Sequence, residues 1–242
     1  MPVTVLPVPV LSDNYVWLLT DEDTGTVGVV DPGDAPPVRT AIEAHGGRLD
    51  LILLTHHHSD HTGGAEALRE RYGARIVGAA ADATRLPRLD QAVRAGDRVA
   101  FGQSSALVLE TPGHTIGHIA YYFDDPPLLF CGDTLFSLGC GRLFEGTAAE
   151  MFESFRKFGA LPDQTRVCCG HEYTESNARF ALRVDPDNAA LEKRAAEVFA
   201  LRARGQPTVP STLGSERACN PFLRAPDVET LARLRREKDH AR

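Results

Sequence analysis

The sequence has no pair of cysteines spaced as C-x-x-C, and no apolar run approaching the roughly 18 residues that span a bilayer. The first absence excludes a zinc ribbon and a thioredoxin-type motif. The second predicts a protein without membrane association. No basic segment with a small-residue cleavage site follows the first methionine, so no secretory signal is expected. Together these absences predict a cytoplasmic protein.

Cysteine itself is scarce and odd in number. The five cysteines show no framework spacing, and Cys131, Cys168 and Cys169 lie in apolar stretches. Buried, free thiols of a reducing compartment are the expected state of these residues.

Basic residues are outnumbered, with 26 Lys and Arg against 33 Asp and Glu and a net charge of −7. This balance argues against sequence-independent binding of nucleic acid, which depends on cations against phosphates. The deficit lies in residues 1–172, which hold 13 basic and 23 acidic side chains. Two divalent cations would offset part of that deficit, although an ordinary acidic surface would give the same count.

The chain changes character near residue 172. Before it, short apolar stretches bounded by Gly, Pro and Asp predict strands, with helices between some of them. After it, the pattern predicts helices at 174–184, 189–203 and 228–239, with a Pro- and Gly-rich connection at 205–226. We therefore expect a strand-rich domain at 1–172 and a small helical domain at 173–242. The strands are expected at 3–8, 15–19, 27–30, 49–54, 74–77, 98–101, 106–110, 119–123, 128–131 and 166–169, and the helices at 37–45, 65–72 and 148–158.

A run of histidines follows the buried strand expected at 49–54. In an extended chain alternate side chains share a face, so His56 and His58 point together while His57 points away. Two imidazoles from one segment could thus hold one divalent ion. Asp60 and His61 project elsewhere as the chain turns, which suits a second ion nearby.

Three more candidate ligands lie at strand ends next to glycine: His114, Asp133 and His171. Glycine frees the backbone for a tight turn at such a position. Five histidines and two carboxylates make two neighbouring sites if one carboxylate bridges them, and Asp133 is the expected bridge. Zinc is the expected metal, and iron and manganese accept the same ligands.

Each of these residues, taken alone, is more often an ordinary turn residue than a ligand. Five of the nine histidines nevertheless fall at strand ends in regular order, which makes coincidence a minor alternative. A histidine tract within the chain is not a terminal purification tag. His45, His57 and His240 are expected to have no part in the site, and His118 at most a supporting hydrogen bond.

The run His56-x-His58-x-Asp60-His61, followed by His114, Asp133 and His171, resembles the metallo-β-lactamase superfamily over about residues 1–172. The resemblance implies an α+β fold, a four-layer αβ/βα sandwich with its metals at one edge. It also implies that His56, His58 and His114 hold one metal, that Asp60, His61 and His171 hold the other, and that Asp133 bridges them. Asp31 resembles the acid that orients ligands in this superfamily.

Further segments, spread over nearly the whole chain, resemble the hydroxyacylglutathione hydrolase family: 11–15, 139–147, 169–174, 210–213, 220–222 and 235–238. In that family glutathione is held at positions matching Arg142, Phe144, Tyr173, Arg235 and Lys238. Two matches depart from the commonest pattern, since the Arg142 position is often Lys and the Phe144 position often Tyr. The second departure removes a hydroxyl, and Phe144 would alternatively be a core residue.

The C-terminal helix has a matching physical pattern. Val228, Leu231 and Leu234 recur every three residues and are expected to face the core. Arg235 and Lys238 are neighbours on what we expect to be an exposed face. Glutathione carries two carboxylates, for which such a pair is a suitable receptor. The alternative is a solvated basic helix end that complements the helix dipole.

The resemblance implies a thiolester hydrolase that converts S-D-lactoylglutathione to glutathione and D-lactate, the second step of methylglyoxal detoxification. A monomer is expected. A water activated between the two metals would attack the thioester, with Asp60 and Asp133 acting as ligands and Tyr173 helping to stabilise the oxyanion. The main alternative is a glutathione-persulfide dioxygenase with one iron on the same fold. A lactonase or β-lactamase would have no use for Arg235 and Lys238, and a non-catalytic metal-binding protein would be inactive when loaded.

Overall fold

The computed structural model describes residues 3–241, which form two compact units. Unit 1 comprises Met1–Glu110 and Gly117–Gly132, and unit 2 comprises Thr111–Ile116 and Asp133–Arg242. This division by packing differs from the boundary expected near residue 172, which rests on sequence pattern and stays a prediction.

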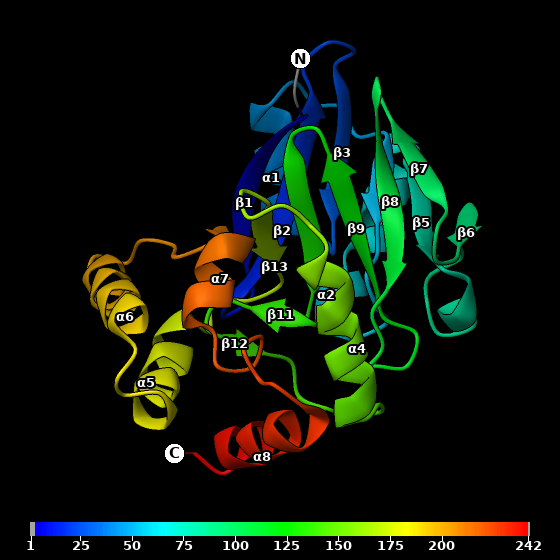
Figure 1. Cartoon of the computed structure of the whole chain (residues 1–242). Helices are drawn as coiled ribbons and strands as arrows, with labels where there is room; N and C mark the ends of the chain where they lie inside the picture. The colour runs from blue at the N-terminus through cyan, green and yellow to red at the C-terminus, as the bar shows by residue number, and fades with distance from the viewer. Residues whose placement is uncertain (1–2, 242) are drawn as a thin grey trace. The chain divides into compact units, whose positions relative to one another are not determined.

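Unit 1 contains a mixed six-stranded sheet in the order β1-β2-β3-β4-β5-β6 (Figure 1). The first three strands pair antiparallel and the last three run parallel to β3, so β3, β4 and β5 end at the same edge. The strands are β1 (Val3–Val10), β2 (Asn14–Asp21), β3 (Thr26–Val30), β4 (Leu51–Leu53), β5 (Arg75–Ala79) and β6 (Gln91–Val93).

Four antiparallel strands of unit 1 form a second layer: β7 (Arg98–Phe101), β8 (Ser104–Glu110), β9 (Ile119–Asp124) and β10 (Pro127–Gly132). Aromatic rings fill the space between this layer and the first sheet. Phe123 makes edge contacts with Phe101 and Phe130, both at 5.9 Å between centroids. Phe130 in turn contacts Trp17 of β2 at 6.4 Å. The two sheets therefore enclose an apolar core.

Helices α1 (Ala35–Ala44) and α3 (Ala65–Tyr72) accompany the first sheet. Val38 and Ile42 of α1 and Leu68 of α3 are buried in one cluster with strand residues such as Ile52 and Ile76. Ile52 alternates with Leu51 and Leu53, and all three are buried, as is typical of a parallel strand covered on both faces. Strand β4 is thus fixed firmly just before the histidine run. The short α2 (Ser59–Thr62) and the 3-10 turn η1 (Ala80–Asp82) complete unit 1.

Unit 2 is mostly helical. Leu138, Ala178, Leu191 and Val198 belong to a core cluster that joins α5 to α6. Helix α8 packs beside α4, and Thr147 closes the start of α4 with a capping box shared with Glu150. The elements are β11 (Leu135–Phe136), β12 (Gly139–Cys140), α4 (Ala148–Gly159), β13 (Arg166–Cys169), α5 (Thr174–Val184), α6 (Ala189–Arg202), β14 (Ser211–Thr212), α7 (Leu213–Cys219) and α8 (Val228–Asp239).

The expected strands and longer helices are all present, with bounds that shift by at most a few residues. The Pro- and Gly-rich connection at 205–226 contains β14 and α7, which the sequence pattern does not predict. Thr212 caps α7 by accepting a hydrogen bond from the Ser215 amide. In such a short helix the cap and burial of Leu213 outweigh the weak periodicity.

The five cysteines are free and buried, which confirms the expectation for Cys131, Cys168 and Cys169. Within residues 3–241, no helix has the length and apolar character needed to cross a membrane.

The β4 core supports a test of stability. Substitution Ile52→Ala removes a fully buried side chain and should lower the free energy of unfolding by about 2–5 kcal/mol. Leu11→Ala, at a side chain that is 56% exposed, should change it by less than about 0.5 kcal/mol. Urea unfolding followed by circular dichroism measures both. Equal effects of the two substitutions would contradict the assignment of Ile52 to the core.

Candidate metal and substrate site

The histidine run begins directly after β4, at the edge where β3, β4 and β5 end. His56 and His61 are buried, and His58 precedes α2, which carries Asp60 and His61. The carboxyl ends of parallel strands are a common location for ligand sites in α/β sheets. All four of the ligands predicted from unit 1 therefore lie in one loop at that edge.

Asp31, at the end of β3, holds this loop. Its carboxylate accepts hydrogen bonds from the Thr55 amide at 2.8 Å and the Thr55 hydroxyl at 2.6 Å. The second oxygen also lies 3.1 Å from His61 Nδ1. A hydrogen on Nδ1 directed at this carboxylate leaves the Nε2 lone pair of His61 for a metal. Asp31 thus has the position implied by the resemblance, that of an acid that orients ligands.

The ligand atoms of the loop converge. His56 Nε2 lies 3.1 Å from His58 Nδ1, and Thr55 Oγ1 lies 3.0 Å from the other nitrogen of His56. His61 Nε2 lies 3.5 Å from Asp60 Oδ2. Asn14 donates to that same carboxylate oxygen at 3.0 Å, and so orients Asp60.

The ring of His118 stacks on the ring of His56. The two rings lie 4.8 Å apart at 23°, and His118 is buried. Gly132 makes this packing possible. Its φ is +46°, and a Cβ there would lie 2.3 Å from Thr55 Oγ1 and 2.8 Å from His118 Nε2. Only glycine fits both the backbone angle and the space.

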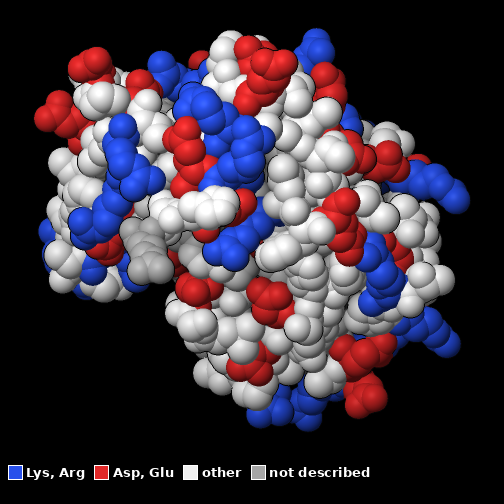
Figure 2. All heavy atoms as spheres, turned by 90° about the horizontal axis from the view of Figure 1, so that it is seen from below, with Lys and Arg blue, Asp and Glu red and all other residues white. Residues whose placement is uncertain are grey.

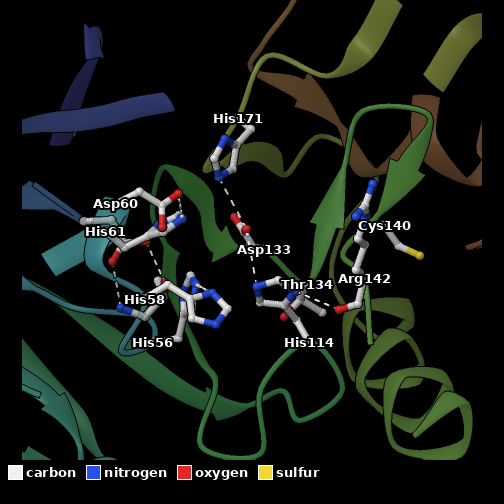
Figure 3. Close-up of polar contacts among 12 residues, drawn as sticks. His56, His58, Asp60, His61, His114, Asp133, Thr134, Cys140, Arg142 and His171 are labelled. Atoms are coloured by element: carbon white, nitrogen blue, oxygen red, sulfur yellow. Dashed lines mark hydrogen bonds and ion pairs between the residues drawn. The ribbon is translucent and has the colours of Figure 1, made fainter. Parts of the chain in front are cut away.

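Unit 2 brings together the other three predicted ligands. Asp133 Oδ2 lies 3.5 Å from His114 Nε2 and 3.4 Å from His171 Nε2 (Figure 3). His114 Nδ1 lies 2.7 Å from the Arg142 carbonyl oxygen, which fixes its hydrogen on Nδ1 and directs the Nε2 lone pair toward Asp133. One carboxylate oxygen nearly equidistant from two imidazole nitrogens has the geometry of a shared ligand.

Both groups fit a metal. In unit 1 the candidate ligand atoms of Asp31, His56 and His61 lie within 4.8 Å of one another. In each unit a buried acceptor fixes the far nitrogen of a histidine, as is usual for metal-ligating imidazoles. These His/Asp clusters indicate that the protein binds divalent metal.

A cavity of about 480 Å³ lies in unit 2 and contains all the predicted glutathione contacts. His114 and Asp133 line it together with Arg142 and Lys238. Figure 2 shows Lys and Arg side chains gathered over the region of α5, α6 and α8. The wall of the cavity consists of His114, Asp133, Phe136, Cys140, Arg142, Phe144, Tyr173, Ser176, Asn177, Arg235, Lys238 and Ala241.

The expectation that Arg235 lies on an exposed face is wrong. It is 6% exposed and donates to the Cys140 carbonyl oxygen at 2.7 Å. Its other nitrogens lie 2.9 and 3.1 Å from Asp239 Oδ1, and its guanidinium stacks on Phe222. The long apolar stem and the flat guanidinium allow such burial, which periodicity alone does not show. Arg235 therefore anchors α8 to β12 as well as lining the cavity.

Lys238 remains more accessible. Its ammonium donates to the backbone oxygen of Ser176 at 2.9 Å and to its hydroxyl at 2.8 Å, and it lies over the Phe180 ring. Partial burial, followed by repulsion from Arg235, Arg183 and Arg142, lowers the pKa of Lys238 from 10.5 to about 8. Lys238 is thus a cation that loses its charge in mildly alkaline solution.

The two aromatic residues predicted from the resemblance both border this cavity. Phe144 is 62% exposed, so the alternative of a core residue is wrong. Its ring contacts His114 at 5.3 Å. Tyr173 stacks on His171 at 4.6 Å and 8°. Each ring therefore lies against a candidate metal ligand, with a face or edge available to a bound molecule.

Some supporting residues were not predicted. Asn14 belongs to one of the segments that carry the resemblance, but its contact with Asp60 joins positions 46 apart in sequence. Ser176 and Asp239 hold Lys238 and Arg235 without any motif of their own. Cys140 borders the cavity, yet burial raises the pKa of its thiol to about 11, which makes it a poor nucleophile at neutral pH.

Residues 11–171 match the family model of the metallo-beta-lactamase superfamily, and the chain belongs to that superfamily of enzymes. Residues 172–241 match the model for the C-terminus of hydroxyacylglutathione hydrolases. Within the superfamily, the chain is a member of the hydroxyacylglutathione hydrolase family.

Relatives of high similarity support that membership. A hydroxyacylglutathione hydrolase of Rhodospirillum rubrum is 55% identical, and the match covers 96% of each chain. Another, from Acidiphilium cryptum, is 56% identical over 98% of this chain and 96% of its own length. The expected family and the enzyme class, thiolester hydrolase, are confirmed.

Solved structures confirm the α+β metallo-β-lactamase fold. ETHE1 from Myxococcus xanthus superposes with a TM-score of 0.73 at 27% identity, covering 100% of this chain and 93% of that one. TTHA1623, solved in a di-iron-bound form, gives a TM-score of 0.57 at 28% identity over 71% of this chain and 91% of its own. The B3 metallo-beta-lactamase BLEG-1, at 24% identity over 91% of this chain and 99% of that one, shares the fold with a TM-score of 0.70.

The environment of Lys238 predicts a measurable titration. Its side chain should titrate near pH 8, because burial and three guanidinium groups disfavour the ammonium. Replacing one of those cations by Arg183→Gln should raise that midpoint. Side-chain nitrogen NMR of the three lysines, assigned with Lys238→Arg, measures the shift. A midpoint unchanged by Arg183→Gln would contradict the predicted repulsion.

Proposed function

We propose that this enzyme hydrolyses S-D-lactoylglutathione and related 2-hydroxyacyl glutathione thioesters to glutathione and the free hydroxy acid. One observation carries the proposal. A single cavity of unit 2 is lined by two candidate metal ligands, His114 and Asp133, and by the cations Arg142, Arg235 and Lys238. Candidate metal ligands and cations suited to an anionic peptide therefore line the same cavity. The substrate is a small molecule, as the family implies.

We further propose that two divalent ions are held by seven side chains acting as one ligand set: His56, His58, Asp60, His61, His114, Asp133 and His171. Asp133 would be the shared ligand, a role supported by its Oδ2, which lies 3.5 Å from His114 Nε2 and 3.4 Å from His171 Nε2. The di-iron form of TTHA1623 is a related case. Zinc is the expected metal, with iron and manganese as alternatives. Bound there, such ions would supply an activated water and a Lewis acid for thioester cleavage.

The residues of unit 2 then divide the remaining work. Arg142 and Lys238 bind the carboxylates of glutathione, and Arg235, most of whose donors are already used, maintains the position of α8 and contributes charge. Phe144 packs against the peptide near His114. Tyr173, held against His171, supports the oxyanion. The thiolate leaves without a strong acid, so no further titrating group is required. A monomer in the cytoplasm remains the prediction.

A glutathione-persulfide dioxygenase with one iron on the same fold is the alternative. The match of residues 172–241 to the hydroxyacylglutathione hydrolase C-terminus favours the hydrolase. Metal analysis combined with an oxygen electrode distinguishes the two enzymes, because only the dioxygenase consumes oxygen.

The bridging carboxylate provides the first test. Asp133→Ala should lower kcat for lactoylglutathione by at least about 1000-fold and reduce the metal content, because both ions lose a shared ligand. Loss of thioester absorbance and elemental analysis are the measurements. Asp163→Ala, at an exposed carboxylate of unit 2, is the control. Full turnover by Asp133→Ala would refute the bridge.

The carboxylate receptor provides a second test. Arg142→Ala and Lys238→Ala should each raise KM for glutathione thioesters about 10- to 100-fold, the loss expected for a charge-assisted hydrogen bond, with little change in kcat. Arg233→Ala changes the same charge on α8 at a residue that pairs with Glu237 away from the cavity, and should leave KM unchanged. A thioester that lacks the glutathione carboxylates should be insensitive to all three. An equal effect on that truncated substrate would argue against the receptor.

A further inference from the structure

The chain has three consecutive histidines, His56, His57 and His58, of which only two are expected to bind a metal ion. The ring of His57 lies 4.9 Å from that of His58, nearly as close as the ring of His56 at 4.7 Å. Proximity alone therefore does not determine which two imidazoles bind a metal. A slip by one residue would offer a different pair, and the sequence pattern assigns His57 no role.

We propose that Asp82 and Arg85 are positioning residues that hold His57 out of the metal-ligand set, so that only His56 and His58 are offered to the ion. This inference rests on the proposed metal site but not on the identity of the substrate.

The contacts around His57 carry the argument. The carboxylate of Asp82, which is 2% exposed, lies 3.3 Å from His57 Nδ1 through Oδ2. Its other oxygen accepts hydrogen bonds from Arg85 Nη2 at 2.5 Å and from Nε at 3.1 Å. The buried carboxylate is thus compensated by a bidentate guanidinium and is held in a fixed orientation.

Both nitrogens of His57 are consequently engaged. A carboxylate only accepts, so the hydrogen of the His57 ring lies on Nδ1, and the lone pair lies on Nε2. Arg85 Nη1 lies 3.4 Å from that Nε2. The one atom with which a neutral His57 could bind a metal therefore faces a guanidinium, whose charge also repels a cation. His56 and His58, by contrast, direct nitrogens toward each other at 3.1 Å.

The backbone leaves room for this arrangement at one position in particular. A Cβ at Gly117 would lie 2.2 Å from the carboxylate carbon of Asp82. Any other residue there would displace Asp82 and, with it, the contact to His57. The turn η1, which ends at Asp82, carries the carboxylate from the end of β5 toward the loop that follows β4.

A double-mutant cycle distinguishes exclusion of His57 from the metal site from a general loss of order in the loop. Asp82→Ala should weaken metal affinity about 10- to 100-fold, the usual effect of removing a residue that orients the ligand sphere. His57→Gln should change it by less than about threefold, because it removes the competing imidazole and no ligand. The double variant should return to the affinity of His57→Gln, since no wrong ligand remains to be excluded. Competition with a chromophoric chelator gives the affinities, and the visible spectrum of the cobalt-loaded protein reports the ligands.

Two further variants control for folding. Arg85→Gln removes the guanidinium from a partly exposed position and should weaken metal binding in the same direction, again with rescue by His57→Gln. Asp21→Ala removes an equally buried carboxylate of unit 1 that bonds Thr24 and Gln103, away from the histidines. It should lower thermal stability without changing metal affinity or the cobalt spectrum.

Metal affinity of Asp82→Ala equal to that of the wild type would overturn the inference. So would a double variant as weak as Asp82→Ala alone, which would indicate that Asp82 only stabilises the loop. If the variants show the predicted changes in metal affinity but the metal-loaded wild-type protein cleaves no thioester, the proposed function is refuted and the inference about His57 stands. If the wild-type protein hydrolyses the thioester but the variants do not show the predicted changes in metal affinity, the inference about His57 is refuted and the proposed function stands.

Discussion

The hydrogen bonds of Asp31 are the interaction on which the site most depends. One buried carboxylate at the end of β3 holds the amide and hydroxyl of Thr55, directly after β4, and the ring of His61 six residues further on. A loop with several imidazoles has no reason to converge by itself, because polar side chains prefer solvent and loop backbone costs entropy to order. The carboxylate supplies that order from the neighbouring parallel strand, whose own position is fixed by an apolar core.

Much of the fold was predictable because its elements depend on local pattern. Buried strands such as β4, and α8 with Leu231 and Leu234 inward, were expected from periodicity. The seven candidate ligands were predictable because metal chemistry restricts residue type at strand ends. Apart from Asp31, which the resemblance implied, the residues that support these ligands were not predictable. Asn14 meets Asp60, and Asp82 meets His57, across distances in sequence that only the tertiary fold brings together. Arg235 shows the remaining failure, since a long side chain that bears a charge was expected outside and is buried.

The cationic side chains near the site have two different roles, one structural and one suited to binding an anion. Arg85 and Arg235 are held by carboxylates and carbonyls, so they fix the positions of other atoms. Arg142 and Lys238 line the cavity wall, where their charges would attract an anion. The roles of these cations depend on their tertiary contacts and are not visible from residue type or charge.

The bond from Arg235 to the Cys140 carbonyl has an evolutionary consequence. It couples the last helix of the chain to a two-stranded hairpin that lies next to Asp133 in sequence and shares a cavity wall with it. A relative that lost α8 would retain all seven candidate metal ligands but would lose Arg235 and Lys238 from the cavity wall. Under the proposed function, such a loss would weaken recognition of the glutathione carboxylates and leave the residues proposed for metal binding in place.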